Sequence, residues 1–429
     1  MIRIAPLGRV LAVTAAASLA LTACSGGEEP KSTTSAAPES SAPGAAAAKG
    51  DGTLTIGTLL PQTGSLAFLG PPEFAGVDLA IEEINAAGGV LGKPVAKVHT
   101  DSGDTTTNIA SQSVDKLLAQ KSDAIIGAAS SSVSLSVIDK ITGAGVVHFS
   151  PANTSDQLTT YADKGLYFRT APPDVLQGRV LGDLVVADGN DTVGILALQD
   201  AYGTGLADNV EKAVVAGGGE VVEKIIYDPK ATDFAADVSK IAAKKPKGIV
   251  LIGFEETAKV MQELVKQGLT ADKHKWYMVD GNLSNTNYVK FPKGTLTGVK
   301  GTQPGAEVKG DFRERMLKTD PALKDFNYGP ESYDATILVA LAAELAKDDS
   351  GTAIASKLIE VSKGGEKCTS YKACLELLKA DKDFDFDGAS GPIEFNDAGD
   401  PAEATIGIYQ YGDDNTNKQL EFRSGKIDG

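Results

Sequence analysis

The chain has 429 residues, with 57 acidic and 41 basic side chains and a formal net charge of −16. Because phosphate binding requires clustered lysine and arginine, this excess of carboxylates argues against a nucleic-acid partner. The length exceeds what one hydrophobic core usually holds, so two lobes are expected beyond the N-terminal region.

The N-terminus has the pattern of a bacterial lipoprotein signal. Arg3 and Arg9 flank a short positive region, and the small apolar run over residues 10–21 is too short to span a bilayer comfortably. The run leads into Leu-Thr-Ala-Cys, where cleavage would leave Cys24 as a lipidated first residue. An ordinary secretory signal is the alternative. We therefore predict a signal peptide over residues 1–24 and an extracytoplasmic protein anchored to the outer face of the cell membrane.

The next segment, residues 25–50, contains almost no large apolar side chain. It cannot bury enough surface to offset the loss of chain entropy, so we predict a disordered linker. The body that begins at residue 51 contains no apolar run long enough to cross a membrane.

Only two cysteines remain after the signal region, Cys368 and Cys374. In an oxidising compartment such a close pair is expected to form one small disulfide loop. Each of the three histidines is isolated in the sequence, which argues against a zinc centre. We expect no metal and no cofactor.

Short β-like runs alternate with amphipathic helical runs along the body. The first set of predicted elements is strand 54–60, helix 73–87, strand 95–100, helix 109–119, strand 124–127, helix 134–142 and strand 146–149. The second set is strands 193–198, 220–227, 249–252 and 275–279, with helices 206–215, 234–243 and 257–267 between them; a helix at 333–346 and β-like runs at 392–395 and 404–410 follow. This order predicts two α/β lobes with doubly wound parallel sheets and a ligand cleft between them.

Seven segments, spread over nearly the whole body, form a specific combination. They read LLPQTGSLAFLGPPEFAGVDLAIEEINAAGGVLGKPV, DAIIGAASSS, HFSPANTSDQLT, YFRTAPPDVLQG, DAYGTGLA, ETAKVMQELVKQG and YMVDGN. Together they resemble the branched-chain amino acid family of solute-binding proteins that serve ABC importers. The resemblance implies a type I periplasmic-binding-protein fold with crossovers between the lobes, and a protein that is not an enzyme. By analogy, one lobe comprises residues 51–170 and 303–380, and the other comprises residues 171–302 and 381–429.

The resemblance also implies a first-lobe side of the ligand site. The family's serine after the third strand, which takes the amino acid's carboxylate, corresponds to Ser130, with Ser131 beside it. These serines precede a helix, whose free N–H groups and dipole favour an anion. The segment after the next strand contributes Ala152, Asn153 and Thr154.

On the second lobe, the family's closing aromatic corresponds to Tyr202, and the carboxylate that pairs with the ammonium corresponds to Asp280. The sequence departs from the family in three respects. The aromatic near the first loop is replaced by Leu69, with Phe68 adjacent, and a second far-lobe aromatic is Phe254, which lacks a hydroxyl. Asp280 is one methylene shorter than the glutamate of the best-known members. With these departures an amino-acid pocket is still expected, but which ligand side chain it prefers is left open.

Alternative interpretations remain for three features of the sequence. The serines could serve a hydrolase if folding brought His148 close as a base, or they could merely cap a helix. Asp280 could be a turn residue, because Asp-Gly is a strong turn signal. The acidic run over residues 383–394 fits the EF-hand pattern, but Pro392 and the strand-like segment that follows favour a solvated turn over a calcium site.

The sequence thus predicts a monomeric, lipid-anchored protein that captures an amino acid, branched-chain or related, and delivers it to an ABC permease. A ligand sensor of the same fold, or a binder of a small amide or urea-like solute, is the alternative.

Overall fold

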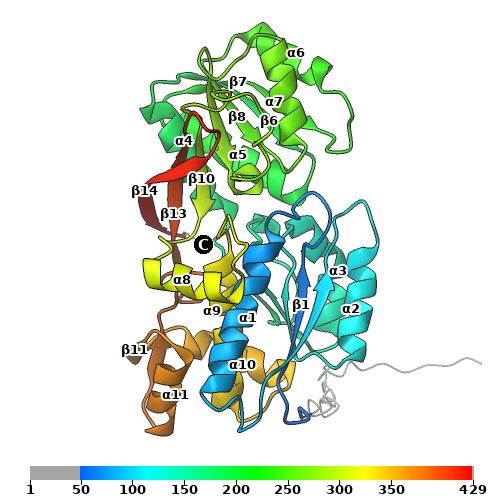
Figure 1. Ribbon diagram of the computed structural model, residues 1–429, viewed down its shortest axis with the longest axis vertical. Coiled ribbons are helices and arrows are strands. Elements are labelled where there is room, and N and C mark those ends of the chain that lie inside the picture. The colour runs from blue at the N-terminus through cyan, green and yellow to red at the C-terminus, as the bar shows by residue number, and fades with distance from the viewer. Residues whose placement is uncertain (1–48, 428–429) are drawn as a thin grey trace, which may run out of the picture. The chain divides into compact units, whose positions relative to one another are not determined.

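The computed structural model describes residues 49–427 (Figure 1). The predicted signal peptide, Cys24 and nearly all of the predicted linker lie outside these residues. Between residues 49 and 427, no helix combines the length and the apolar character that crossing a membrane requires.

The first lobe is built on a five-stranded parallel sheet with the strand order β2-β1-β3-β4-β5. Strands β3 and β4 are buried along their whole length, as expected for a parallel sheet that helices cover on both faces. The strands are β1 (Thr55–Leu60), β2 (Ala96–Asp101), β3 (Ala124–Gly127), β4 (Val147–Ser150) and β5 (Tyr167–Arg169). The helices are α1 (Gly70–Ala86), α2 (Ile109–Ala119), α3 (Ser131–Gly143) and the 3₁₀ turn η1 (Asp156–Leu158).

The second lobe contains a seven-stranded sheet with the order β14-β13-β10-β9-β8-β6-β7. Strands β6 to β10 run parallel, and the hairpin of β13 and β14 adds to β10 in antiparallel fashion. The strands are β6 (Thr192–Leu198), β7 (Glu220–Tyr227), β8 (Gly248–Ile252), β9 (Lys275–Val279), β10 (Lys300–Pro304), β13 (Glu403–Tyr411) and β14 (Asn417–Lys426). The helices are α4 (Asp174–Ala187), α5 (Ala201–Ala216), α6 (Ala235–Lys244), α7 (Thr257–Lys266) and η2 (Asp280–Asn282).

After β10 the chain returns to the first lobe. The elements of this return are α8 (Gly310–Thr319), α9 (Gly329–Ala346), α10 (Gly351–Val361), β11 (Glu366–Cys368), α11 (Tyr371–Lys379) and β12 (Phe384–Phe386). Phe384, Phe386 and Phe395 are buried in the same hydrophobic cluster as the first-lobe strands. The second-lobe sheet resumes only at Glu403, so the packing places this crossover later than the predicted boundary at residue 380.

The predicted strands up to β9 occur within a residue of the expected positions. The β-like run predicted at 392–395 is not a strand, because Pro392 and its neighbours form only an isolated bridge between Phe395 and Pro401. Helix α4 was not predicted, since its apolar side chains and two glycines give it no one-sided pattern. A Cβ on Gly178 would lie 2.5 Å from Asn209 Cβ, so the glycine allows α4 to approach α5 closely.

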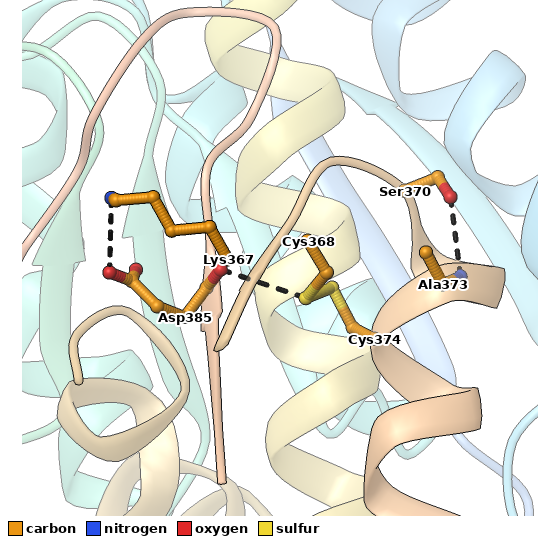
Figure 2. Close-up of a disulfide and its surroundings, with 6 residues drawn as sticks. All are labelled: Lys367, Cys368, Ser370, Ala373, Cys374 and Asp385. Atoms are coloured by element: carbon orange, nitrogen blue, oxygen red, sulfur yellow. Dashed lines mark hydrogen bonds and ion pairs between the residues drawn. A yellow bond between two sulfur atoms is a disulfide. The ribbon is translucent and has the colours of Figure 1, made fainter. Parts of the chain in front are cut away.

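Cys368 and Cys374 are joined by a disulfide that connects the end of β11 to α11 (Figure 2). Both cysteines are buried, and Ser370 between them caps α11 by accepting a hydrogen bond from the Ala373 N–H. Lys367 Nζ pairs with Asp385 Oδ2 at 3.1 Å across the two short strands. The disulfide and the Lys367–Asp385 ion pair together stabilise a small unit made of β11, α11 and β12.

We expect that replacing both cysteines with alanine lowers the free energy of unfolding by about 2 kcal/mol, because a short closed loop is released in the unfolded chain. Urea unfolding followed by circular dichroism measures this. Reduction of the disulfide in the wild-type protein should lower the free energy of unfolding by the same amount. An unchanged urea midpoint would contradict the expectation.

The acidic run over residues 383–394 does not form a loop of the EF-hand type, because its first part is strand β12. Asp385 and Asp387 both pair with Lys367, at 3.1 and 3.4 Å. In residues 49–427 no group of three or more histidine, cysteine, aspartate or glutamate side chains is arranged to hold a metal ion.

Candidate functional site

A small cavity lies between loops of the first lobe and loops of the second. Most of its walls come from the carboxyl ends of strands in both sheets, which is where open α/β sheets bind ligands. The lining residues are Leu66, Leu69, Ala129, Ser130, Ser131, Ala152, Thr154, Tyr202, Phe254, Asp280, Gly281 and Tyr328.

Two serines organise the first-lobe wall at the start of α3. Ser130 is the N-cap, and its Oγ accepts a hydrogen bond from the Val133 N–H at 3.3 Å. Ser131 Oγ accepts hydrogen bonds from the N–H groups of Thr154 and Ser155, at 3.3 and 3.2 Å, and so holds the loop after β4 against α3. Capping satisfies one N–H of the first turn, and the others keep the positive end of the helix dipole available to an anion.

Hydrogen bonds join the two lobes beside the cavity. The N–H of Ala201, the first residue of α5, donates to Ser132 Oγ at 3.0 Å, and Ser155 Oγ donates to the Ala201 carbonyl at 3.1 Å. Asn209 Nδ2 donates to Asp156 Oδ2 at 2.7 Å. We call the bonds around Ala201 the interlobe contact.

Asp280 follows β9 directly and is only 5% exposed. Its Oδ1 accepts hydrogen bonds from Tyr202 Oη and Gln177 Nε2, both at 2.8 Å, and its Oδ2 accepts one from Tyr328 Oη at 2.7 Å. Each carboxylate oxygen accepts about two hydrogen bonds, so Oδ2 keeps one acceptor position.

Burial raises the pKa of Asp280 above its usual value, and the hydrogen bonds from Tyr328, Gln177 and Tyr202 act in the opposite direction. No ion pair within residues 49–427 includes Asp280. A buried carboxylate with a remaining acceptor position at a cavity wall is suited to a cationic group.

The rest of the second-lobe wall is aromatic. The rings of Tyr202 and Phe254 are stacked, with centroids 5.6 Å apart and planes inclined by 7°. Burial and the charge of Asp280 raise the pKa of Tyr202 well above its usual value, so its hydroxyl stays protonated and donates. Leu66 and Leu69 add apolar surface from the first lobe. The cavity therefore combines polar groups with a lipophilic lining.

Two predicted site residues do not line the cavity. The Asn153 side chain donates to the carbonyls of Ala128 and Ala129, at 3.0 and 2.8 Å, and accepts from Tyr167 Oη. The Asn153 side chain therefore stabilises the loop after β3 without lining the cavity. Phe68 is partly buried and packs against the second-lobe core, while Leu69 beside it lines the cavity.

The sequence did not identify Leu66, Ala129, Gly281 and Tyr328 as lining residues, or Gln177 as a partner of Asp280. Tyr328 precedes α9 and adopts a left-handed backbone conformation at φ 59°. It lies 48 positions from Asp280, and nothing in the surrounding FNYGP sequence indicates that its hydroxyl reaches the other lobe.

His148 lies inside the first-lobe sheet, with its ring edge-on to Tyr167 at a centroid distance of 5.3 Å. Burial lowers its pKa to about 4. No hydrogen bond within the described part of the chain joins its ring to Ser130, Ser131 or Ser132. The nucleophile–base contact of a serine hydrolase is thus not formed there.

The profile of the periplasmic binding protein family matches residues 53–416. Leu/Ile/Val-binding protein homolog 3 of Brucella melitensis is 28% identical over 369 residues, which cover 84% of this chain and 92% of the relative. The chemotactic signal transduction substrate-binding protein BasB of Halobacterium salinarum is 26% identical over 385 residues, which cover 87% of this chain and 90% of BasB.

The crystal structure of the Streptococcus pneumoniae branched-chain amino acid transporter substrate-binding protein LivJ, in complex with isoleucine, shares the fold. Its TM-score is 0.71 and its identity 23%, with coverage of 87% of this chain and 100% of LivJ. The chain therefore belongs to the periplasmic binding protein family, whose members bind substrates and are not enzymes.

Proposed function

We propose that the protein captures an amino acid, branched-chain or related, in the cavity between its lobes and delivers it to an ABC importer. The observation on which this rests is Asp280, a buried carboxylate with a remaining acceptor position and no cationic partner within residues 49–427. An α-ammonium group supplies the missing positive charge and the missing donor.

The first-lobe wall suits the other end of a zwitterion. A carboxylate placed at Ser130 and the start of α3 meets backbone N–H groups, a hydroxyl and the positive end of the helix dipole. Thr154 adds a second hydroxyl, and Leu69 and Phe254 offer apolar contact to an aliphatic side chain. The relatives named above for leucine, isoleucine and valine support this choice of ligand.

Capture proceeds by closure of the lobes. The ligand first binds to the wall formed by Ser130, Ala152 and Thr154, and Tyr202 and Asp280 then complete its surroundings from the second lobe. The loaded form docks on the permease, and Cys24, with residues 25–50 as a spacer, tethers the protein to the outer face of the membrane.

Binding of free amino acids should raise the melting temperature of the chain purified in detergent, because a ligand that binds only the folded state stabilises it. We expect clear shifts with leucine, isoleucine or valine, by differential scanning fluorimetry. Glycine betaine should give none, because its quaternary ammonium has no N–H for Asp280 Oδ2. A shift with acetamide, urea or benzoate but with no amino acid would contradict the zwitterion site.

A second candidate function is ligand sensing, which the similarity to the chemotactic protein BasB favours. The two functions share the cavity and differ in the membrane partner. Reconstitution with a permease and its ATPase distinguishes them, because stimulation of ATP hydrolysis by the loaded protein requires an importer.

A further inference from the structure

Gln177 of α4 does not line the cavity, but its side chain contacts Asp280 directly. We propose that Gln177 is a positioning residue that keeps Asp280 ionised and directs its Oδ2 toward the ligand. This inference rests on the proposed function, in which Asp280 receives the ammonium group.

The orientation of the Gln177 amide is determined by its neighbours. Nε2 donates to Asp280 Oδ1 at 2.8 Å, and to the carbonyl oxygen and Oγ1 of Thr302, both at 3.2 Å. If the amide were reversed, its oxygen would face Asp280 Oδ1 and the Thr302 carbonyl oxygen, neither of which has a hydrogen to donate. The amide therefore links Asp280, at the end of β9, to the neighbouring strand β10.

Packing alone does not explain a glutamine at this position. Gln177 is fully buried, and its Oε1 has no hydrogen-bond partner within residues 49–427. A buried polar atom without a partner is costly, and leucine would fill similar space without that cost. The hydrogen bond to Asp280 gives the amide a function that an apolar side chain cannot perform.

The other groups around Asp280 show why a further donor matters. Asp174, three positions earlier on α4, is also buried, and burial first, then the charges of Asp156 and Asp280, raise its pKa well above its usual value. Tyr202 of α5 and Tyr328 before α9 donate to the carboxylate, as Gln177 does. With Tyr202 and Gln177 occupying Oδ1, the remaining acceptor position is on Oδ2, so Gln177 also determines where the ammonium binds.

The test compares the wild-type chain with Gln177→Leu, both ¹³C-labelled at aspartate carboxyls, ligand-free and in detergent. The Asp280 signal is assigned as the one missing in Asp280→Asn. Without the amide donor, we expect the pKa of Asp280 to rise by about one pH unit. Binding of L-leucine requires the carboxylate and is lost as pH falls through this pKa. Its loss should therefore begin at higher pH in the variant, whose affinity is weaker than that of the wild type by a factor that approaches about ten below both pKa values.

Gln112→Leu, an exposed glutamine on α2, is the matched control and should leave both titrations unchanged. Gln177→Glu, nearly isosteric, places a second carboxylate beside Asp280 and should raise its pKa further. Unchanged titration of Asp280 in both Gln177 variants would overturn the inference. Absence of leucine binding in the wild type would instead count against the proposed function, since the ligand-free titration reads the effect of Gln177 separately.

Discussion

Asp280→Asn should lower the affinity for L-leucine by roughly 30- to 4,000-fold, the equivalent of about 2–5 kcal/mol. The variant keeps the shape of the side chain but removes the negative charge that pairs with the ammonium group. Its melting temperature without ligand should stay equal or rise, because Asp280 has no cationic partner within residues 49–427 to lose. Isothermal titration calorimetry measures the affinity.

Asp183→Asn is the matched control, since Asp183 is exposed on α4. It should bind L-leucine as the wild type does. Equal affinity of the wild type and Asp280→Asn would show that the ammonium group binds elsewhere. The similarity to the Leu/Ile/Val-binding relatives would then extend to the fold but not to this carboxylate.

Arg169→Met should lower the free energy of unfolding by about 3–5 kcal/mol, because it leaves a buried carboxylate without its partner. Arg169 is fully buried, and its Nε and Nη2 contact the two carboxylate oxygens of Asp400 at 2.6 and 3.0 Å. Its Nη1 donates to the carbonyls of Asn153 and Ser155, so the variant also frees the loop that supplies Thr154 to the cavity.

Urea unfolding measures the loss, and calorimetry with L-leucine measures the accompanying weakening of binding. Arg423→Met removes a half-exposed guanidinium that pairs with Glu421, and it should change stability by no more than about 0.5 kcal/mol. A similarly small effect of Arg169→Met would show that the buried pair is replaceable by apolar packing.

The hydrophobic pattern predicted most of the fold, because short apolar strands and one-sided helices have distinct periods. It did not predict α4, which is buried nearly all round, or the packing of Phe384 and Phe386 in the first-lobe core, which alternation alone cannot assign to one lobe. The two lobes and the parallel sheets followed from element order, while the position of the last crossover depended on tertiary contacts.

For the site, the family resemblance indicated residues that directly follow strands, and Ser130 and Asp280 do line one cavity. The partners of Asp280 could not be predicted in the same way. Gln177 lies 103 positions away on a helix, and Tyr328 lies in an irregular loop. Asn153 illustrates the opposite case. It belongs to a segment that lines the cavity, but its side chain does not line it and donates instead to the carbonyls of Ala128 and Ala129.

The interlobe contact at Ala201 has a consequence for the kinetics of ligand binding. Ser132 and Ser155 bond to the backbone of Ala201 through groups that need no ligand, so part of the closure energy is intrinsic to the polypeptide. The contact therefore favours the closed conformation in the unloaded protein as well, and under the proposed function an empty closed protein competes with the loaded protein for the permease. The apparent affinity for the ligand is reduced by the fraction of molecules that are closed and empty, because these cannot accept a ligand. The rate of ligand association is limited by how often the lobes open.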